Sequence, residues 1–486
     1  MQPWLGHPFD DDKLKEECGV FGVIGVTDAA NFVALGLHAL QHRGQEAGGI
    51  ITHDAKNGFN SAHRFGLVRD NFTSAKLMET LPGSLGIGHV RYSTAGSKGA
   101  TAIRDVQPFF GEFAMGGAAI AHNGNITNAA AIRRELIERG SIFQSSSDSE
   151  CIIHLMARSF QTTIAERLKD ALRRVEGAFS IVAMTRTKLI GARDGLGVRP
   201  LVLGRIGDGW ALASETCALD IIGAEFVREI EPGEMVVIDD KGVTSSRPFA
   251  AAQSRFCIFE HVYFSRPDSI LGGRSVYETR RQIGVELARE APADGDLVCP
   301  VPDSGTPAAI GFSQESGIPF AMGIIRNQYM GRTFIEPSEQ IRNMGVRLKL
   351  NVNRALVQGK RIVLVDDSVV RGTTSQKIKQ MILEAGASEV HFRIASPPTT
   401  WPCFYGVDTP ERSKLLAARM TEDEMRDYIG VQSLKFISLD GLYRAAGEAK
   451  GRSNSCPQFC DACFSGEYPV APSDMIAKGF ELKAAE

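Results

Sequence analysis

The chain has 486 residues, which is too long for one ordinary hydrophobic core and predicts two large domains. Its composition, 43% apolar and 23% charged, is typical of a soluble globular protein, and a formal net charge of −3 argues against nucleic acid or an anionic membrane as a partner. No apolar run approaches the roughly 20 residues of a transmembrane helix, and the first 17 residues carry five acidic side chains without the apolar segment of a secretion signal, so we expect a cytoplasmic protein.

The first half of the chain predicts many strands and few helices. Short apolar runs separated by glycine turns predict strands at Gly19–Val26, Leu85–Val90, Ala118–Ala121, Ser180–Thr185 and Glu234–Ile238. Helices are predicted at Ala29–Leu40 and Ala130–Glu138, and the first of them places Phe32, Leu35, Gly36 and Ala39 on one face. This mixture predicts sheets covered by helices.

The second half has a different pattern. A polar, small-residue stretch at Ser245–Ser254 marks the predicted domain boundary. Beyond it, predicted strands at Leu297–Val301, Arg361–Asp366 and Val390–Ala395 alternate with helical segments such as Gln376–Ala385, which predicts a doubly wound parallel sheet. The last 20 residues carry no motif and predict a loosely held tail.

One segment of the second half combines a strand, two acids and a small-residue turn. It is RIVLVDDSVVRGTTS, residues 361–375. Open α/β sheets bind ligands at the carboxyl ends of their strands, where Asp366 and Asp367 can accept hydrogen bonds from a ribose diol.

The residues after these acids predict a phosphate cradle. Gly372, Thr373 and Thr374 can turn successive backbone amides towards one anion, and the predicted helix that follows directs its positive end at the same point. Gly386 suits the end of that helix. The alternative is that these residues bind no ligand: the two aspartates then only cap a helix, and the threonines only fill a turn.

The whole segment resembles the phosphoribosyl pyrophosphate (PRPP) signature of type I phosphoribosyltransferases. The resemblance extends to Pro302–Pro307, which would hold pyrophosphate, and to the glycine-containing loop Tyr329–Ile335, which would close over the substrate and exclude water. Mg²⁺ is expected to arrive with PRPP and to meet the oxygens of Ser304, Asp366 and Asp367. The residues expected to bind PRPP are Ser304, Arg332, Asp366, Asp367, Ser368, Arg371, Gly372, Thr373, Thr374 and Ser375.

Cys18 begins a strand-like run and, taken alone, would be an ordinary buried cysteine. Four other segments of the first half change this interpretation: QHRGQE at 41–46, GHVRYST at 88–94, HNGN at 122–125 and SSDSE at 146–150. Together these segments resemble the glutamine amidohydrolase domain of the N-terminal-nucleophile (Ntn) class.

The resemblance implies a role for each matching residue. Residues 1–17 would be a propeptide, and its removal would free the α-amino group of Cys18 to act as base for the Cys18 thiol. Asn123 and Gly124 would stabilise the oxyanion, Arg91 would bind the α-carboxylate of glutamine, and Asp148 would pair with its α-ammonium. We interpret the neighbouring His89 and His122 as structural.

Nine cysteines in so long a chain are too few for a disulfide scaffold. Cys460 and Cys463 form a CDAC pair whose spacing suits a metal, whereas the cysteines at 151, 217 and 299 lie in apolar surroundings typical of a core. Spacing alone does not identify further ligands, and Cys456 is an alternative to Cys460.

Joined in one polypeptide, the two sets of motifs resemble the amidophosphoribosyltransferases, in particular their bacterial and plant branch. That branch implies a [4Fe–4S] cluster on Cys257, Cys403, Cys460 and Cys463, with a structural role, feedback by purine nucleotides and a homotetramer. The chain departs from the family's frequent Lys-Asn-Arg-Tyr with Arg326, Asn327, Gln328 and Tyr329, which puts the role of Arg326 in question.

The predicted organisation is a propeptide (1–17), an Ntn αββα glutaminase sandwich (18–250), a type I phosphoribosyltransferase sheet (257–450) and a C-terminal segment with cluster cysteines (451–486). The predicted reaction converts glutamine and PRPP to 5-phosphoribosylamine, pyrophosphate and glutamate, with ammonia passing inside the protein. Two alternatives are a non-catalytic PRPP-binding regulator, which would not need the glutaminase residues, and a salvage phosphoribosyltransferase, which would not use the amide nitrogen of glutamine.

Overall fold

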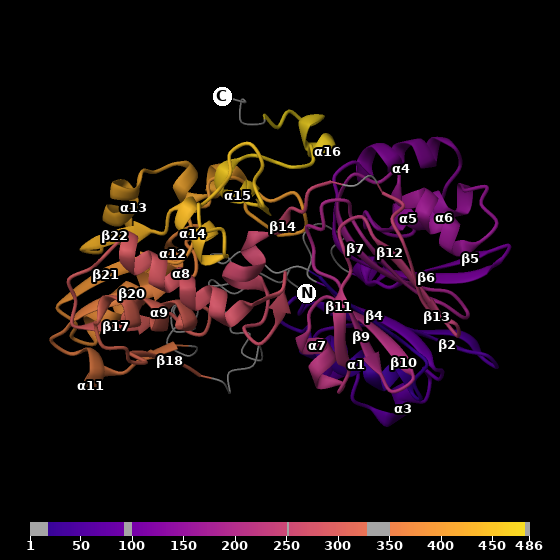
Figure 1. The fold of residues 1–486 in the computed structure, drawn as a ribbon, viewed down its shortest axis with the longest axis horizontal. Coiled ribbons are helices and arrows are strands. Elements are labelled where there is room, and N and C mark those ends of the chain that lie inside the picture. The colour runs from indigo at the N-terminus through magenta and orange to yellow at the C-terminus, as the bar shows by residue number, and fades with distance from the viewer. Residues whose placement is uncertain (1–17, 92–99, 250–251, 328–349, 482–486) are drawn as a thin grey trace.

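A computed structural model describes residues 18–91, 100–249, 252–327 and 350–481. Two parts lie side by side, the earlier half of the chain on the right of Figure 1 and the later half on the left, with the C-terminal segment above them. No helix within those four ranges is long and apolar enough to cross a membrane.

The first half contains two antiparallel sheets. In spatial order the first is β11 (Glu225–Glu229), β9 (Val202–Ile206), β10 (Gly209–Ala213), β1 (Gly19–Ile24), β4 (Leu85–Arg91), β2 (Ala47–Asp54) and β3 (Gly58–Phe65). The second is β13 (Gly242–Ser246), β12 (Met235–Asp239), β8 (Leu189–Arg193), β7 (Gly177–Met184), β6 (Gly116–Ile126) and β5 (Phe109–Phe113).

These sheets form the middle layers of an αββα sandwich. Along β1, Val20 joins the core between the sheets, whereas Phe21 and Val23 join the core on the opposite face, as the alternation of a strand requires. A side chain at Gly36 would meet the Phe21 ring, so its glycine allows close packing of helix on strand. The first sheet is covered by α1 (Ala29–Ala39) and α7 (Cys217–Ile221), and the second by α4 (Ala129–Glu138), α5 (Glu150–Arg158) and α6 (Ile164–Leu172).

The second half is built on a parallel sheet with helices on both faces. In spatial order its strands are β17 (Leu297–Pro300), β20 (Arg361–Asp366), β21 (Glu389–Ile394) and β22 (Ser433–Phe436). Val363 and Val365 of β20 join the core with one set of helices, and Ile362 and Leu364 join the core with the other. The first set is α8 (Val276–Glu290), α9 (Thr306–Ser316) and α14 (Leu439–Ala445), and the second is α12 (Thr373–Glu384) and α13 (Glu422–Ile429).

Short elements complete both halves. The first half also has α2 (Val68–Asn71), α3 (Ala75–Met78) and the 3₁₀ turn η1 (Ala100–Asp105). The second also has a π-helical turn η2 (Glu260–Phe264), the strand pairs β15 (Ile270–Leu271) with β16 (Arg274–Ser275) and β18 (Ile324–Arg326) with β19 (Leu350–Val352), α11 (Arg354–Val357) and the 3₁₀ turns η3 (Arg412–Lys414) and η4 (Leu416–Ala418).

The C-terminal segment returns to both halves. Its strand β23 (Phe459–Cys460) pairs in parallel with β14 (Phe256–Cys257), and α15 (Ala462–Ser465) follows. The next short helix, α16 (Ser473–Ile476), lies beside α4 (Figure 1), where the Asp474 carboxylate accepts hydrogen bonds from the amides of Ala130 (2.6 Å) and Ala131 (3.2 Å). The prediction of a loosely held tail is therefore wrong for this part, because Asp474 satisfies amides in the first turn of α4.

Most predicted elements occur within a few residues of their expected bounds, but two differ where function is concerned. The strand expected at Ala118–Ala121 runs from Gly116 to Ile126 and includes the whole HNGN motif. The helix expected from Gln376 begins at Thr373, because Gly372 takes a left-handed conformation (φ 80°) and its carbonyl accepts the amide of Gln376 at 3.1 Å.

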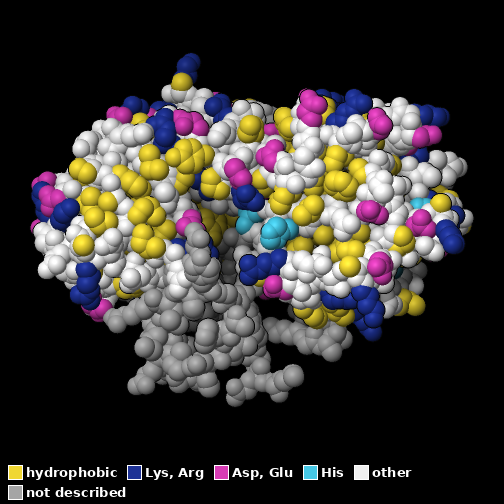
Figure 2. Space-filling view, turned by 90° about the horizontal axis from the view of Figure 1, so that it is seen from below, with side chains coloured by type: hydrophobic (Ala, Val, Ile, Leu, Met, Phe, Trp, Pro, Cys, Tyr) yellow, Lys and Arg dark blue, Asp and Glu magenta, His cyan; other side chains and the backbone are white. Residues whose placement is uncertain are grey.

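The charges of the surface are mixed. On the face seen in Figure 2, basic and acidic side chains are interspersed over both halves, in keeping with a net charge of −3. A bound anion would therefore be attracted by local groups rather than by the field of the whole molecule.

Candidate functional site

Cys18 and Arg91 lie at the same end of the first sheet. The half-buried Cys18 directly precedes β1, and the register that pairs Gly19 with Val90 brings it beside Arg91, the last residue of β4. Arg91 is 8% exposed, and its Nη2 lies 3.6 Å from Oδ2 of Asp105. Asp105 also accepts the amide and hydroxyl of Ser146, at 2.7 and 2.8 Å. Asp105 therefore orients Arg91, a role that no motif in the sequence indicates.

Asn123 and Gly124 lie on β6, which packs against β1 and β4 across the sandwich. Asn123 is fully buried, and among the described residues neither atom of its side-chain amide has a hydrogen-bond partner. Gly124 has φ 140°, and a Cβ there would lie 2.0 Å from the carbonyl oxygen of Ala178. A buried amide is seldom left without partners, so Asn123 is prepared to meet a polar ligand.

Asp148 is tied to the same strand. Its Oδ2 accepts the amide of Ile126 at 2.9 Å and lies 4.0 Å from Nδ1 of His122, while its Oδ1 accepts the hydroxyl of Ser149 at 3.0 Å. The Asp148 side chain is 24% exposed, which leaves a carboxylate edge open to a ligand.

The two histidines next to these motifs are buried. Burial lowers the pKa of His89 to about 3, and burial also lowers the pKa of His122 despite the opposing charge of Asp148. His89 contacts the carbonyl of His122 through Nε2 at 3.1 Å, and Nδ1 of His122 contacts Ser149 at 2.8 Å. Burial thus disfavours the charged form of both rings, which pack into the strand layer.

In the second half, two loops bring four oxygen-bearing side chains together. Asp366 ends β20, Asp367 follows it, and both are 3% exposed. The Ser304 hydroxyl, from the loop after β17, donates to Oδ1 of Asp367 at 2.5 Å, and the Ser368 hydroxyl donates to its Oδ2 at 2.7 Å. The loops can approach because a Cβ at Gly305 would lie only 2.5 Å from the carbonyl of Val365.

The predicted phosphate cradle is the start of α12. Thr373, Thr374 and Ser375 form the first helical turn, whose amides have no partner within the helix, and Gly372 precedes it. The structure therefore corrects the predicted form of this segment, because the threonines lie in the helix rather than in a turn before it. The binding of an anion there stays a prediction. Arg371 is half-buried beside this turn.

The predicted closing loop falls outside the residues that the structure describes. Gln328, Tyr329 and Arg332 all lie outside the described residues, so the roles expected of these three residues stay predictions. Arg326 is described, and it forms an exposed ion pair of 2.7 Å with Asp303 in the loop after β17.

Four of the nine cysteines line one hollow between the two halves: Cys257, Cys403, Cys460 and Cys463. Burial raises the pKa of the Cys460 and Cys463 thiols well above their usual value, and the neighbouring cysteines raise it further. Cys456 lies outside the lining, exposed and in contact with Gln253. Among the described residues no three His, Cys, Asp or Glu side chains are placed for a single metal ion.

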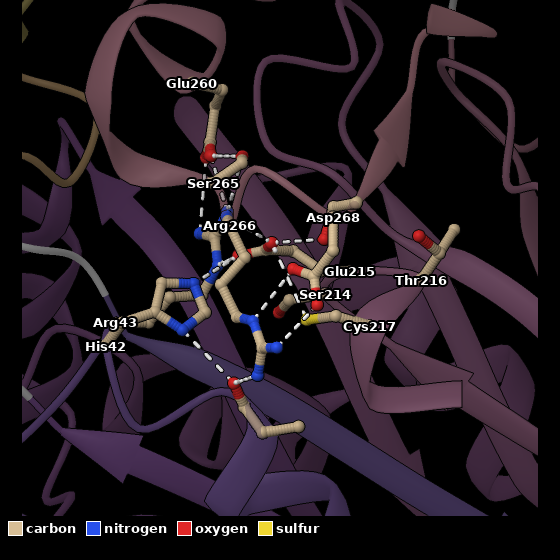
Figure 3. Close-up of polar contacts among 12 residues, drawn as sticks. His42, Arg43, Ser214, Glu215, Thr216, Cys217, Glu260, Ser265, Arg266 and Asp268 are labelled. Atoms are coloured by element: carbon tan, nitrogen blue, oxygen red, sulfur yellow. Dashed lines mark hydrogen bonds and ion pairs between the residues drawn. The ribbon is translucent and has the colours of Figure 1, made fainter. Parts of the chain in front are cut away.

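The halves also share a buried ion network, drawn in Figure 3, which the sequence did not reveal. Arg43, from the QHRGQE motif, lies between Glu215 and Glu260 and bonds both. Glu260 also accepts a hydrogen bond from Arg199 at 3.3 Å. All four side chains are at most 1% exposed. Burial opposes ionisation of Glu215, but Arg43 and His42 together hold its pKa below the usual range.

Comparisons with known proteins agree with this arrangement. A family model described as a glutamine amidotransferase domain matches residues 94–220. An amidophosphoribosyltransferase of Rhizobium etli is 55% identical over 95% of this chain and 94% of its own length. Amidophosphoribosyltransferase 2 of Arabidopsis thaliana, a chloroplastic protein, is 49% identical over 96% of this chain and 82% of its own length.

A solved structure extends the likeness to three dimensions. The glutamine PRPP amidotransferase of B. subtilis, in complex with ADP and GMP, matches with a TM-score of 0.87 and 44% identity, over 94% of this chain and 98% of that one.

Proposed function

The chain belongs to the amidophosphoribosyltransferases, the glutamine-dependent enzymes of purine biosynthesis, and on that premise we propose which of its residues carry out the reaction. The reaction converts glutamine, PRPP and water to 5-phosphoribosylamine, pyrophosphate and glutamate, the first committed step of the pathway. Neither a regulator without activity nor a salvage phosphoribosyltransferase is favoured by relatives that cover almost the whole chain.

Glutamine is cleaved at the end of the first sheet. We assign the nucleophile to the Cys18 thiol and the base to its α-amino group, which removal of residues 1–17 frees and whose ordinary pKa of about 7.7–8.0 suits proton transfer at neutral pH. Arg91, oriented by Asp105, binds the α-carboxylate of glutamine, and the open edge of Asp148 receives its α-ammonium.

The observation that carries this assignment is the buried amide of Asn123, which has no partner among the described residues. Attack on the amide of glutamine creates a tetrahedral oxyanion, which needs donors already in place. The side chain of Asn123 and the backbone amide of Gly124 supply them.

PRPP binds at the carboxyl edge of the parallel sheet. The first turn of α12, with Gly372 and Arg371, receives the 5′-phosphate, while Asp366 and Asp367 receive the ribose diol. Ser304 and the loop around it receive pyrophosphate, and Arg332 closes over it from the loop that follows Arg326.

Mg²⁺ fits the oxygen groups beside this site. Ser304, Asp366 and Asp367 offer few protein ligands, which suits an ion that takes most of its coordination from phosphate oxygens and water. When bound, the ion neutralises charge on the departing pyrophosphate.

The four cysteines that line one hollow suit a [4Fe–4S] cluster. Buried thiols crowded together remain protonated unless metal binds them as thiolates. In a cluster each cysteine binds a different iron, so the sulfurs stand further apart than the ligands of one ion. We assign the cluster to Cys257, Cys403, Cys460 and Cys463, and its role is to hold the two halves and the C-terminal segment together.

The remaining parts of the proposal concern exchange between sites and assembly. Ammonia released at Cys18 passes inside the protein to C1 of PRPP, which keeps it from water. Purine nucleotides inhibit the enzyme, since the B. subtilis structure contains ADP and GMP. We also propose that the enzyme is a homotetramer and that it acts in the cytoplasm.

Anaerobic purification provides the test. The intact mass should lack residues 1–17, iron and sulfide should be present at four atoms each per chain as the composition [4Fe–4S] requires, and glutamate release should depend on Cys18. A chain that keeps residues 1–17 and yet cleaves glutamine would remove the α-amino group from the mechanism, and replacement of Cys456 that abolishes iron binding would overturn the cluster assignment.

A further inference from the structure

The segment from Cys403 to Gly406 joins the four-cysteine hollow to the strand that carries the oxyanion residues. At the hollow, the amide of Tyr405 donates to the sulfur of Cys403 at 3.3 Å, and the amide of Cys403 donates to the hydroxyl of Thr409 at 2.7 Å. Cys403 is thus held in a tight turn, and Tyr405, two residues later, also lines the hollow.

The other end of this segment contacts β6 at two points. The side-chain amide of Asn125 donates to the carbonyl of Phe404 at 2.8 Å, although the two residues are 279 positions apart in the sequence. Gly406 has φ 119°, and a Cβ there would lie 3.2 Å from both the Cα and the carbonyl carbon of Gly124. The backbone of Gly406 therefore packs directly against the backbone of Gly124.

The segment is rigid between its ends. The carbonyl of Tyr405 accepts from Nε of Arg199 at 2.8 Å, and its phenol donates to the carbonyl of Val470 at 2.5 Å and accepts the Val470 amide at 3.0 Å. Arg199 also donates to Glu260 of the network between the halves. Tyr405 is 1% exposed, so this region has little freedom to adjust.

We propose that Phe404–Gly406 is a positioning element of the glutaminase: it fixes Gly124 and Asn125, and so aims the oxyanion donors from the other half of the chain. This inference rests on the proposed roles of Asn123 and Gly124. The proposal makes glutamine hydrolysis depend on how the segment Phe404–Gly406 packs against β6. We expect the PRPP site, at the carboxyl ends of β17 and β20, to function without this contact.

Gly406→Ala is the first test, because its methyl group pushes on Gly124 without touching substrate. We expect the kcat for glutamine hydrolysis to fall by about 10-fold or more, since small misplacements of catalytic groups are costly, while KM for glutamine stays within about 2-fold. Synthesis of phosphoribosylamine from added ammonia should be unchanged. Gly317→Ala is the matched control, because Gly317 also has positive φ (72°) but a Cβ there meets nothing within 4 Å.

Asn125→Asp is the second test. It keeps the size of the side chain but removes the N–H group that donates to the carbonyl of Phe404. Both variants displace the same positioning element, although at different contacts, so the double variant should lose less kcat than the product of the single losses. Unchanged kcat in both, a change confined to KM, or losses that multiply would each overturn the proposal. Asn123→Ala separates the oxyanion assignment from the positioning proposal. Full glutaminase activity in Asn123→Ala would refute the oxyanion assignment itself. Loss of activity in Asn123→Ala, together with normal activity in Gly406→Ala and Asn125→Asp, would refute only the positioning proposal.

Discussion

Replacement of Asn123 by alanine separates a catalytic role from a structural one. Because the side-chain amide of Asn123 is buried and bonds nothing among the described residues, its removal breaks no internal hydrogen bond, and we expect the free energy of unfolding to change by less than about 1 kcal/mol. Loss of one oxyanion donor typically reduces kcat by about 10²–10³-fold, equal to about 2.7–4 kcal/mol of transition-state stabilisation. The variant should therefore be stable and nearly inactive towards glutamine.

The assay follows glutamate release from saturating glutamine with PRPP present, beside thermal unfolding of the same samples. Asn71→Ala is the matched control with the opposite profile, since the Asn71 amide donates to the carbonyls of Phe65 (2.8 Å) and Leu67 (3.0 Å). It should lower stability and leave kcat unchanged. If Asn123→Ala unfolds easily, or cleaves glutamine at more than about a tenth of the normal rate, the reasoning from its unpartnered amide is wrong.

Three further changes test other parts of the account. Asp367→Asn weakens charged hydrogen bonds and the Mg²⁺ site, so KM for PRPP should rise about 10-fold or more in both glutamine- and ammonia-dependent assays; an effect on glutamine alone would contradict this. Arg43→Met leaves two buried carboxylates without their cation and should lower the free energy of unfolding by about 3–5 kcal/mol in denaturant titrations, whereas a neutral result would show that the network is dispensable. The pKa of Glu234 is lowered to about 2, because hydrogen bonds, foremost from Arg228, outweigh its burial. The stability that its charge provides is complete above pH 4.5 and is lost as pH falls towards 2. Glu234→Gln should therefore reduce the loss of unfolding free energy between pH 4.5 and pH 2 by about 1–3 kcal/mol, and an unchanged loss would refute this.

The sequence predicted those parts of the site that lie close together along the chain. Asp366, Asp367 and Gly372 lie in one strand–turn–helix unit. The apolar run before the acids predicts the strand, and the glycine after them predicts the turn that leads into the helix. The start of α12 was misplaced because Thr373 and Thr374 also suit turns, and the left-handed Gly372 decides where the helix begins.

Contacts between distant segments could not be predicted in this way. Asp105 reaches Arg91 only because the 3₁₀ turn η1 ends beside the last residue of β4, and Arg43 meets Glu260 only after the halves pack together. The docking of Asp474 onto α4 likewise depends on where the chain returns, and no local pattern records it. The grouping of four cysteines was suggested by resemblance, since spacing alone left Cys456 and Cys460 as alternatives.

Transfer of the amide nitrogen tests the central claim most directly. The processed enzyme would be given glutamine labelled with ¹⁵N at its side-chain amide, PRPP, Mg²⁺ and unlabelled ammonium, and the phosphoribosylamine formed would be analysed by mass spectrometry. We expect mainly ¹⁵N in the product, and in Cys18→Ala only unlabelled nitrogen at an undiminished ammonia-dependent rate. Product without ¹⁵N from the unaltered enzyme, or labelled product from Cys18→Ala, would contradict the account.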